Sequence, residues 1–527
     1  MIKLSIRMTG MMAMLLLVLS GCHKDLDRFP PNDVTSAALY KDINGYTQVL
    51  AKVYGSMALT GNSGPAGSGD LAGIDEGTSD FLRLFWKAQE LSTDEAVVAW
   101  NDPGIQDFHN MNWSSSNSML TGLYNRCFYI ITLSNEFIRE SADAKLAERK
   151  ISGADADAIK TMRAEARFIR AFQYWVLMDL FANPGFVTEE TSIGAGVRPE
   201  QIKRADLYKY IETELKALET ALPAAKSSPY GRADRAAAQA LLARLYLNAG
   251  VYTGTANWTE AMTYAKKVID ANYALLSDYR HLLLADNHVG NTEVIWSLNY
   301  DGLKTKNWGG TTFLVNASVG GDMDQTISGL SKWGGLRTTK NLPNLFPDFT
   351  GTADKRAQFF QQNLEINNVS NFKDGFAVTK FRNRTKSGGF GTDPERTHSD
   401  IDFPVFRLGE MYLIYMEAAA RSNTNVATAV GYANLLRQRA YGNTSGNINA
   451  SMLNADFVLD ERARELYWEG FRRTDLVRYG RFTDGTYLWP WKGGVRTGTG
   501  VDAFRRIYPI PSTEVGSNPN IKQNPNY

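Results

Sequence analysis

The chain has 527 residues, and 43% of them are hydrophobic, which is ample for a large folded body. It has 57 Lys and Arg against 56 Asp and Glu, and this net charge of +1 argues against nucleic acid as a partner. Aromatic residues make up 11% of the chain, a share that suggests a surface on which a flat ligand can stack.

The first 21 residues have the features of a secretory signal segment. Lys3 and Arg7 give a positive start, and the apolar stretch 11–19 is well short of the roughly 20 residues that a membrane-spanning helix needs. Small residues then lead directly into Cys22, a pattern that resembles the bacterial lipobox. We therefore expect residues 1–21 to be removed and Cys22 to carry the acyl chains that hold the protein at a membrane.

The sequence after Cys22 predicts a tether followed by one folded body. Residues 22–35 are polar and interrupted by proline, and residues 36–527 form the predicted body. Cys127 is the only other cysteine. Acylation of Cys22 would leave it without a partner for an internal disulfide, so the hydrophobic core must stabilise the fold.

Helical periodicity dominates several segments. In "RAEARFIRAFQYWVLMDLF", apolar residues from Ala164 to Met178 recur at spacings of three and four, which places them on one helix face. In "GRADRAAAQALLARLYLNAG", a stripe of small residues runs from Ala236 to Leu247, and a second stripe at 258–268 predicts a partner helix. Two helices with alanine-rich contact faces and a tight connection are typical of a tetratricopeptide-type hairpin.

Two later zones continue this design. Segments 406–422 and 429–442 repeat the helical pattern. In "LDERARELYWEGFRRTDLVRYG", one helix face is predicted to carry Leu459, Ala463, Leu466, Gly470 and Thr474.

The amino-acid composition changes between about residues 272 and 400. This region is rich in Gly, Asn, Thr and Asp and predicts long loops with a few short strands. Loops on a rigid scaffold commonly hold binding residues, so we expect the ligand region here. The tail 508–527 contains four prolines and is predicted to be extended and to lie against the body as a clasp.

Motifs for catalysis are absent from the sequence. Its five histidines form no HExxH and no pair at metal-ligand spacing, and there is no phosphate-binding glycine loop and no G-x-S-x-G elbow. Asp-Glu pairs occur in "GIDEGTSD" and "STDEAVVAW", and two carboxylates can hydrolyse a glycoside, but adjacent residues do not by themselves face each other across a sugar. We predict no enzyme activity, no cofactor and no metal site.

Tryptophans in loop contexts are the more informative feature. Trp100 precedes the turn-forming run Asn-Asp-Pro-Gly, and Trp308 and Trp333 are each followed by two glycines. Glycine beside an indole leaves both ring faces accessible. Trp175 and Trp258 lie on helical stripes, and we expect them to pack in the core.

These motifs occur in an order that resembles the SusD family, the starch-utilisation-type outer-membrane lipoproteins of the Bacteroidetes. The resemblance rests on the lipobox, the helical segments quoted above and the closing "YPIPSTEVGSNPN", and it spans nearly the whole mature chain. It implies a mainly α fold, in which four tetratricopeptide-like helical hairpins support a loop-rich half with a few short strands. It also implies a cell-surface glycan-binding lipoprotein of the outer membrane that delivers ligand to a SusC-like TonB-dependent transporter.

The resemblance also implies site residues. "GIDEGTSDFLR", "STDEAVVAW" and "DGLKTKNWGGTTFLV" are similar to stretches of the family's founding starch-binding member, in which three aromatic residues cradle the glucan. The implied glycan-binding residues, with Asp102 as an alternative to the asparagine, are Trp100, Trp308, Trp333, Asp75, Arg83 and Asn101.

Two departures bear on the ligand. The middle aromatic is tyrosine in the starch binder and Trp308 here, and a long segment after the third aromatic is much shorter in this chain. The broader indole favours an extended β-glucan such as xyloglucan or mixed-linkage glucan slightly over starch. Two alternatives stay open: a peptide-capturing scaffold lipoprotein, and a lipid-anchored glycosidase with its acid and base among Asp75, Glu76, Asp94 and Glu95.

Overall fold

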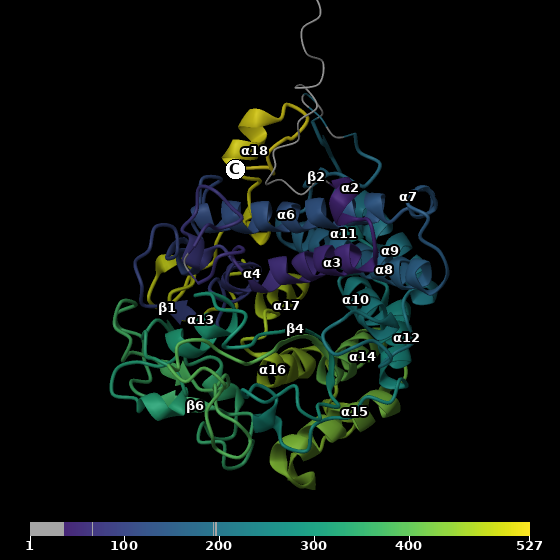
Figure 1. Ribbon diagram of the computed structural model, residues 1–527. Coiled ribbons are helices and arrows are strands. Elements are labelled where there is room, and N and C mark those ends of the chain that lie inside the picture. The colour runs from purple at the N-terminus through teal and green to yellow at the C-terminus, as the bar shows by residue number, and fades with distance from the viewer. Residues whose placement is uncertain (1–35, 66, 193, 195, 197) are drawn as a thin grey trace, which may run out of the picture.

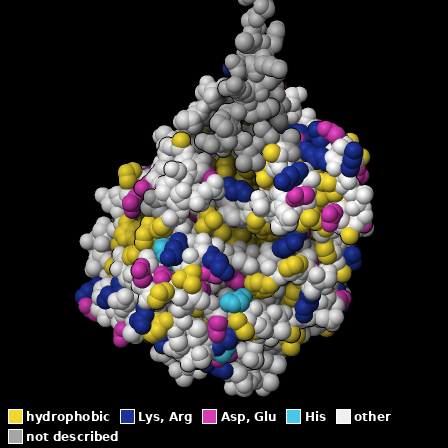
Figure 2. Space-filling model, in the orientation of Figure 1, with side chains coloured by type: hydrophobic (Ala, Val, Ile, Leu, Met, Phe, Trp, Pro, Cys, Tyr) yellow, Lys and Arg dark blue, Asp and Glu magenta, His cyan; other side chains and the backbone are white. Residues whose placement is uncertain are grey.

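The structure is a computed structural model that describes residues 36–527 except 66, 193, 195 and 197. The predicted signal segment, Cys22 and the tether therefore lie outside the described residues. Within the described part, no helix is both long enough and apolar enough to cross a membrane. Figure 2 shows acidic and basic side chains intermingled over one face of the molecule.

The molecule is mainly helical, as predicted. In Figure 1 the helices occupy the top and right, while the loops around β6 and α13 lie at the lower left. The α-helices are α2 (Ser36–Leu39), α3 (Ile43–Ala58), α4 (Phe81–Glu90), α5 (Asp107–Asn110), α6 (Ser118–Glu140), α7 (Asp143–Glu148), α8 (Gly153–Phe181), α9 (Arg204–Ala221), α10 (Arg235–Leu247), α11 (Ala249–Thr253), α12 (Trp258–Ile269), α13 (Gly310–Ala317), α14 (Leu408–Ser422), α15 (Val426–Tyr441), α16 (Ala455–Leu466), α17 (Arg472–Arg478) and α18 (Ser512–Ser517).

Successive long helices pack side by side, in the order α6, α8, α9, α10, α12, α14 and α15. Helix α10 begins where the Asp234 carboxylate accepts hydrogen bonds from the backbone N–H groups of Ala236 and Ala237. Its alanines are fully buried, so the backbones of α10 and α12 approach closely, and the predicted pairing of these two helices is confirmed. Their classification as tetratricopeptide-like hairpins stays a prediction.

The strands are short and form two-stranded antiparallel ladders, and β4, β5, β6 and β7 lie in the predicted loop-rich region. The pairs are β1 (Val97–Val98) with β5 (Leu336–Arg337), β2 (Gly185–Phe186) with β3 (Glu200–Gln201), β4 (Val294–Leu298) with β8 (Phe403–Arg407), and β6 (Phe359–Gln361) with β7 (Phe376–Val378).

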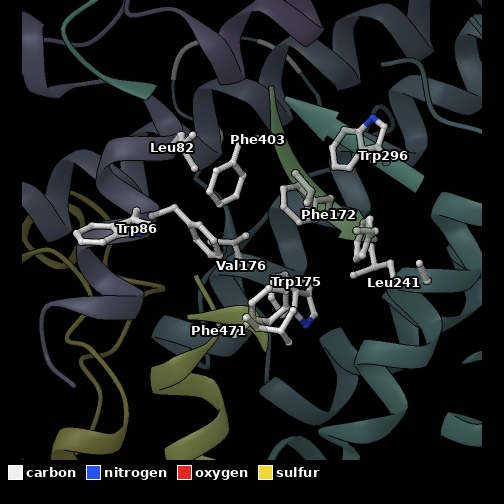
Figure 3. Packing of buried hydrophobic residues seen from close by; sticks show 14 of the residues in the cluster. Leu82, Trp86, Phe172, Trp175, Val176, Leu241, Trp296, Phe403 and Phe471 are labelled. Carbon is white, nitrogen blue, oxygen red and sulfur yellow. The ribbon is translucent and has the colours of Figure 1, made fainter. Parts of the chain in front are cut away.

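One hydrophobic cluster runs through both the helical part and the loop-rich part. Figure 3 shows Phe172 of α8 between Trp175 of the same helix and Trp296 of β4. The rings of Phe172 and Trp296 meet edge to face at 5.4 Å between centroids. Trp175 is buried as predicted, whereas Trp258 is only half-buried at the start of α12.

The helix predicted across 459–480 is interrupted. Helix α16 ends at Leu466 and α17 begins at Arg472, and between them Trp468 takes a left-handed conformation with φ of 65°. The Trp468 N–H donates to the Glu95 carboxylate at 3.1 Å, and the Gly470 N–H donates to the Glu90 carboxylate at 2.7 Å. These side chains satisfy two of the backbone N–H groups between the helices.

Two further expectations were wrong in part. Segment 310–317 was expected to be loop or strand but forms α13, and the tail expected to be extended contains α18. The predicted contact of the tail with the body is observed, because the Asn524 amide donates to the backbone oxygens of Phe181 and Tyr508.

A buried network of ion pairs joins the loop-rich part to the helices. Arg407 contacts Glu293 at 2.9 Å, Glu465 at 2.6 Å and Glu469 at 2.7 Å, while Arg439 contacts both Glu293 and Glu465. Burial by itself would raise the pKa of Glu465, but the charges of the surrounding arginines outweigh it and lower that pKa to about 2.

We predict that Glu465→Gln lowers the free energy of unfolding by about 3–5 kcal/mol at pH 7, because buried arginine charges would lose their partner. The native pKa is lowered, so this stabilisation is present above the unfolded pKa of about 4.3 and is lost as the pH falls toward 2. Urea unfolding at pH 7 and pH 3 should show the gap between wild type and variant narrowing at the lower pH.

The matched control is Glu395→Gln at an exposed glutamate, which should change the unfolding free energy by less than about 0.5 kcal/mol. A Glu465→Gln protein as stable as wild type at pH 7 would contradict the assigned role of the network.

Candidate functional site

The structure brings the three predicted tryptophans together. Trp333 lies between the other two, with ring centroids 6.4 Å from Trp100 and 6.2 Å from Trp308. The ring planes are tilted by 45° and 57°. All three side chains are half-buried, so they form a continuous aromatic surface rather than part of the core. We call Trp100, Trp308 and Trp333 the tryptophan arc.

The ladder of β1 and β5 fixes the position of Trp100 relative to Trp333. Trp100 follows β1 and Trp333 precedes β5, and the Ala99 N–H donates to the Gly335 carbonyl at 2.8 Å just beyond the paired residues. Only glycine fits at 335, because a Cβ there would lie 2.4 Å from Cε2 of Trp100. The indole of Trp100 therefore rests directly on Gly335, the residue just before β5.

Helix α13 fixes the position of Trp308 relative to Trp333. Trp308 lies two residues before its first residue, and the Trp333 N–H donates to the Asn316 carbonyl at 2.9 Å near its last turn. The Gly335 N–H donates to the Ala317 carbonyl at 2.8 Å. These bonds satisfy carbonyls that the helix end would leave unpaired, and they hold Trp333 at a fixed place relative to Trp308.

Asp80 holds the N-terminus of α13 against that of α4. Its Oδ1 accepts the Arg83 N–H and the Gly310 N–H, each at 3.0 Å. A Cβ at Gly309 would lie 1.5 Å from Asp80 Oδ2, so glycine is required there. Burial raises the pKa of Asp80, and these backbone donors and the Arg83 charge act against that rise.

Arg83 lies behind the tryptophans and is largely buried. Its Nη1 donates to the carbonyls of Gly77 and Trp308, both at 2.9 Å, and its guanidinium lies 5.9 Å from the Trp100 ring and 4.5 Å from Phe313. Burial lowers the pKa of Arg83 to about 10. The arginine therefore positions the Trp308 backbone from below, although it also lines the hollow beside Trp100.

The other predicted polar residues are at the surface. Asn101 and Asp102 are both exposed and line, with Arg83, Trp100 and Pro103, a hollow of about 620 Å³. Asp75 is also exposed. Asp75 and Trp308 are neighbours across Gly77. A Cβ added to Gly77 would lie 3.3 Å from Asp75 Oδ1 and 3.3 Å from Trp308 Cδ1, which places Asp75 at the Trp308 end of the arc.

Sequence reasoning missed the residues that support the arc from behind. The His398 ring lies 5.0 Å from that of Trp308, and Phe313 lies 6.0 Å from Trp100. Asp80 precedes the apolar run of α4 and had a readable N-cap signal. No sequence signal marked His398, which is brought to Trp308 by tertiary packing alone.

Of the four carboxylates in the glycosidase alternative, Asp75 lies near the arc, whereas the other three have partners elsewhere. Asp94 and Glu95 are buried, the first paired with Arg472 at 2.7 Å and the second accepting the Trp468 N–H. Glu76 accepts a hydrogen bond from Thr60. In the described part of the chain, no three His, Cys, Asp or Glu side chains gather as a metal site would require.

We predict that Gly335→Ala disturbs the arc, because the new methyl group must displace the Trp100 indole or the β5 backbone. The cost should be about 1–3 kcal/mol of unfolding free energy, with a changed near-ultraviolet circular dichroism spectrum that reports on indole packing. Gly431→Ala is the matched control, since no atom lies within 4 Å of its added Cβ. Unchanged spectrum and stability in Gly335→Ala would refute the described seating of Trp100.

Two family models match parts of this chain. A family model described as "SusD family" matches residues 350–527, and one described as "Starch-binding associating with outer membrane" matches residues 83–247. The chain is 33% identical to the starch-binding protein SusD of Bacteroides thetaiotaomicron, over 96% of each chain. It is 22% identical to the SusD-like protein P2 of Formosa agariphila, over 97% of this chain and 98% of that one.

Solved structures show the same fold. A SusD homologue from Bacteroides thetaiotaomicron superposes with a TM-score of 0.74 at 17% identity, over 94% of this chain and 99% of that one. Surface glycan-binding protein A from Bacteroides fluxus gives a TM-score of 0.70 at 20% identity, over 92% and 99%. With one relative above 30% identity across nearly its whole length, the chain belongs to the SusD family.

Proposed function

We propose that this protein is a cell-surface glycan-binding lipoprotein that holds saccharide on the tryptophan arc. The observation that carries the proposal is the arc itself: three half-buried indoles in contact range, each fixed by backbone hydrogen bonds. Two relatives named for starch binding and for surface glycan binding support the same class of ligand. We further propose that it delivers the saccharide to a SusC-like TonB-dependent transporter in the outer membrane.

Stacking accounts for the expected affinity. A pyranose has one face rich in C–H groups, and covering roughly 50 Å² of it with an indole contributes about 1–1.5 kcal/mol. Three such contacts, less the cost of association, predict binding of short oligosaccharides at about 10⁻⁵ to 10⁻³ M. Hydrogen bonds from Asp75, Asn101 or Asp102 would orient the sugar, and polymers that reach several protein copies would bind more tightly.

The shape of the arc bears on the choice of glucan. The sequence preference for an extended β-glucan assumed a broad, flat aromatic surface. Tilts of 45° and 57° between neighbouring indoles give a curved surface instead, and a curved surface fits a helical α-glucan. The name of the Bacteroides thetaiotaomicron relative, starch-binding protein SusD, points the same way. We therefore propose a starch-like α-glucan as ligand, ahead of xyloglucan or mixed-linkage glucan.

We predict that Trp308→Ala and Trp333→Ala each weaken binding roughly tenfold, the loss of one stacking contact, with little change in melting temperature. Affinity electrophoresis in gels containing starch, xyloglucan or mixed-linkage glucan measures the binding. Trp258→Ala is the matched control, because Trp258 is also half-buried but lies on α12.

The alternative functions predict different results in these assays. Retardation by no polysaccharide would favour the peptide-capturing alternative, and release of reducing sugar at enzyme-like rates would favour the glycosidase. Loss of binding together with a large fall in melting temperature would mean that these tryptophans act as core residues.

We also predict that Cys22→Ala moves the protein from the membrane fraction to the soluble fraction, because the thiol that would carry the acyl chains is removed. Cell fractionation followed by immunoblotting measures this. Cys127→Ala, at the buried second cysteine, is the control and should leave the distribution unchanged. Membrane association that persists in Cys22→Ala would refute the lipid anchor.

A further inference from the structure

A second hollow, of about 440 Å³, is strongly basic. It lies in the loop-rich part, between the 3₁₀ turn at Tyr279–His281 and the segment 382–388. No acidic side chain is among its lining residues, whose cationic or titratable members are Arg280, His281, Arg382, Arg384 and Lys386. We call this set the basic hollow.

The positive charge of the basic hollow is only partly compensated. Arg280 pairs with Asp278 at 2.6 Å, and the Asp286 carboxylate accepts the backbone N–H of Lys386 at 3.0 Å. Among the residues that the structure describes, the side chains of Arg382, Arg384 and Lys386 have no carboxylate within ion-pair distance. Their hydrogen bonds go to neutral oxygens, such as the Val289 carbonyl at 2.8 Å from Lys386 Nζ. A neutral oxygen satisfies a donor but does not cancel its charge.

Arg382 is the member of this set whose guanidinium has an unsatisfied buried N–H group. Its Nε is buried and has no hydrogen-bond partner, and its Nη2 makes only long bonds, of 3.4 Å to the Arg280 carbonyl and 3.3 Å to Gln358. Burial, followed by the neighbouring charges of Arg280 and Arg384, lowers the pKa of Arg382, and Tyr467 and Asp278 act against that shift. An anion would relieve this repulsion.

The hollow is also held in place by backbone contacts. The Arg382 N–H donates to the Leu283 carbonyl at 3.1 Å, and the Arg384 carbonyl accepts from the Ala285 N–H at 2.9 Å. The Arg384 guanidinium donates to the Thr326 carbonyl at 3.1 Å and lies 4.2 Å from the Phe390 ring. The cations therefore stay together despite their repulsion, which is the arrangement of a preorganised anion site.

We propose that the basic hollow binds a small oxyanion: sulfate, phosphate or a carboxylate group. Guanidinium groups offer paired N–H donors that match the oxygen spacing of such groups, and charge-assisted hydrogen bonds of this kind are the strong ones. The chemistry is the same whether the oxyanion is free or is carried by an acidic sugar. This inference does not rest on the tryptophan arc, although Thr326 belongs to the loop that connects α13 to Trp333.

The test is calorimetric titration of the folded protein at constant ionic strength with sulfate, phosphate, glucuronate and, as a neutral control, glucose. We expect saturable binding of at least one oxyanion in the millimolar range and none of glucose. Tighter binding of glucuronate than of sulfate would identify an acidic sugar as the ligand, and the reverse order a free inorganic anion; both support the proposal.

Arg384→Met and Lys386→Met keep the side-chain stem and remove the charge, and each should weaken oxyanion binding at least fivefold. Lys386 is exposed, so its variant tests the site even if Arg384→Met is unstable. Arg163→Met, on α8, is the matched control and should bind as wild type does. Absence of saturable oxyanion binding, or equal binding by wild type and Lys386→Met, overturns the proposal.

The two proposals fail separately. Trp308→Ala should leave oxyanion binding unchanged, and Lys386→Met should leave retardation by a neutral glucan unchanged. Loss of oxyanion binding in Trp308→Ala would overturn the basic hollow as an independent site, whatever the result for the glucan.

Discussion

The candidate site depends on one buried carboxylate that joins two helix N-termini. Asp80 accepts the N–H groups of Arg83 in the first turn of α4 and of Gly310 at the start of α13, so these helices cannot move apart without leaving buried donors unpaired. From this junction Arg83 extends beneath Trp100 and binds the carbonyl of Trp308. Helix α13 then receives the loop that carries Trp333 at its other end. The geometry of the tryptophan arc is a consequence of backbone hydrogen bonding rather than of contact among the indoles.

The loops can carry a site because the body beneath them is rigid. The hydrophobic cluster continues from α8 into β4 and α13, and the ion pairs around Arg407 are completed by residues from both parts of the chain. Each buried charge in that network is expensive to leave unpaired, so its geometry resists partial opening. The indoles of the arc are half-buried, so part of each side chain packs on this frame and part remains exposed.

Different interactions would drive ligand binding at the arc and at the basic hollow. At the arc, apolar ring faces would be covered by the C–H groups of a sugar, and charge contributes little beyond orientation. At the basic hollow, the driving force would be relief of repulsion among Arg280, Arg382 and Arg384, and salt should screen it. A ligand with both a neutral sugar face and an acidic substituent would satisfy both surfaces, and each surface would respond to different solution conditions.

The sequence by itself determined the mainly helical fold, the pairing of α10 with α12 and the three tryptophans as candidates, because periodicity and glycine neighbours are local signals. It could not determine that 310–317 is a helix, since Thr, Phe and Val there favour a strand and the capping Asp80 lies 230 residues away. Nor could it reveal the break at Trp468, whose backbone N–H donates to the side chain of Glu95, 373 residues away in the chain. Those features, with the curvature of the arc and the crowding of arginines in the basic hollow, were decided by tertiary contacts, because a buried N–H or charge takes whichever partner the fold brings within reach.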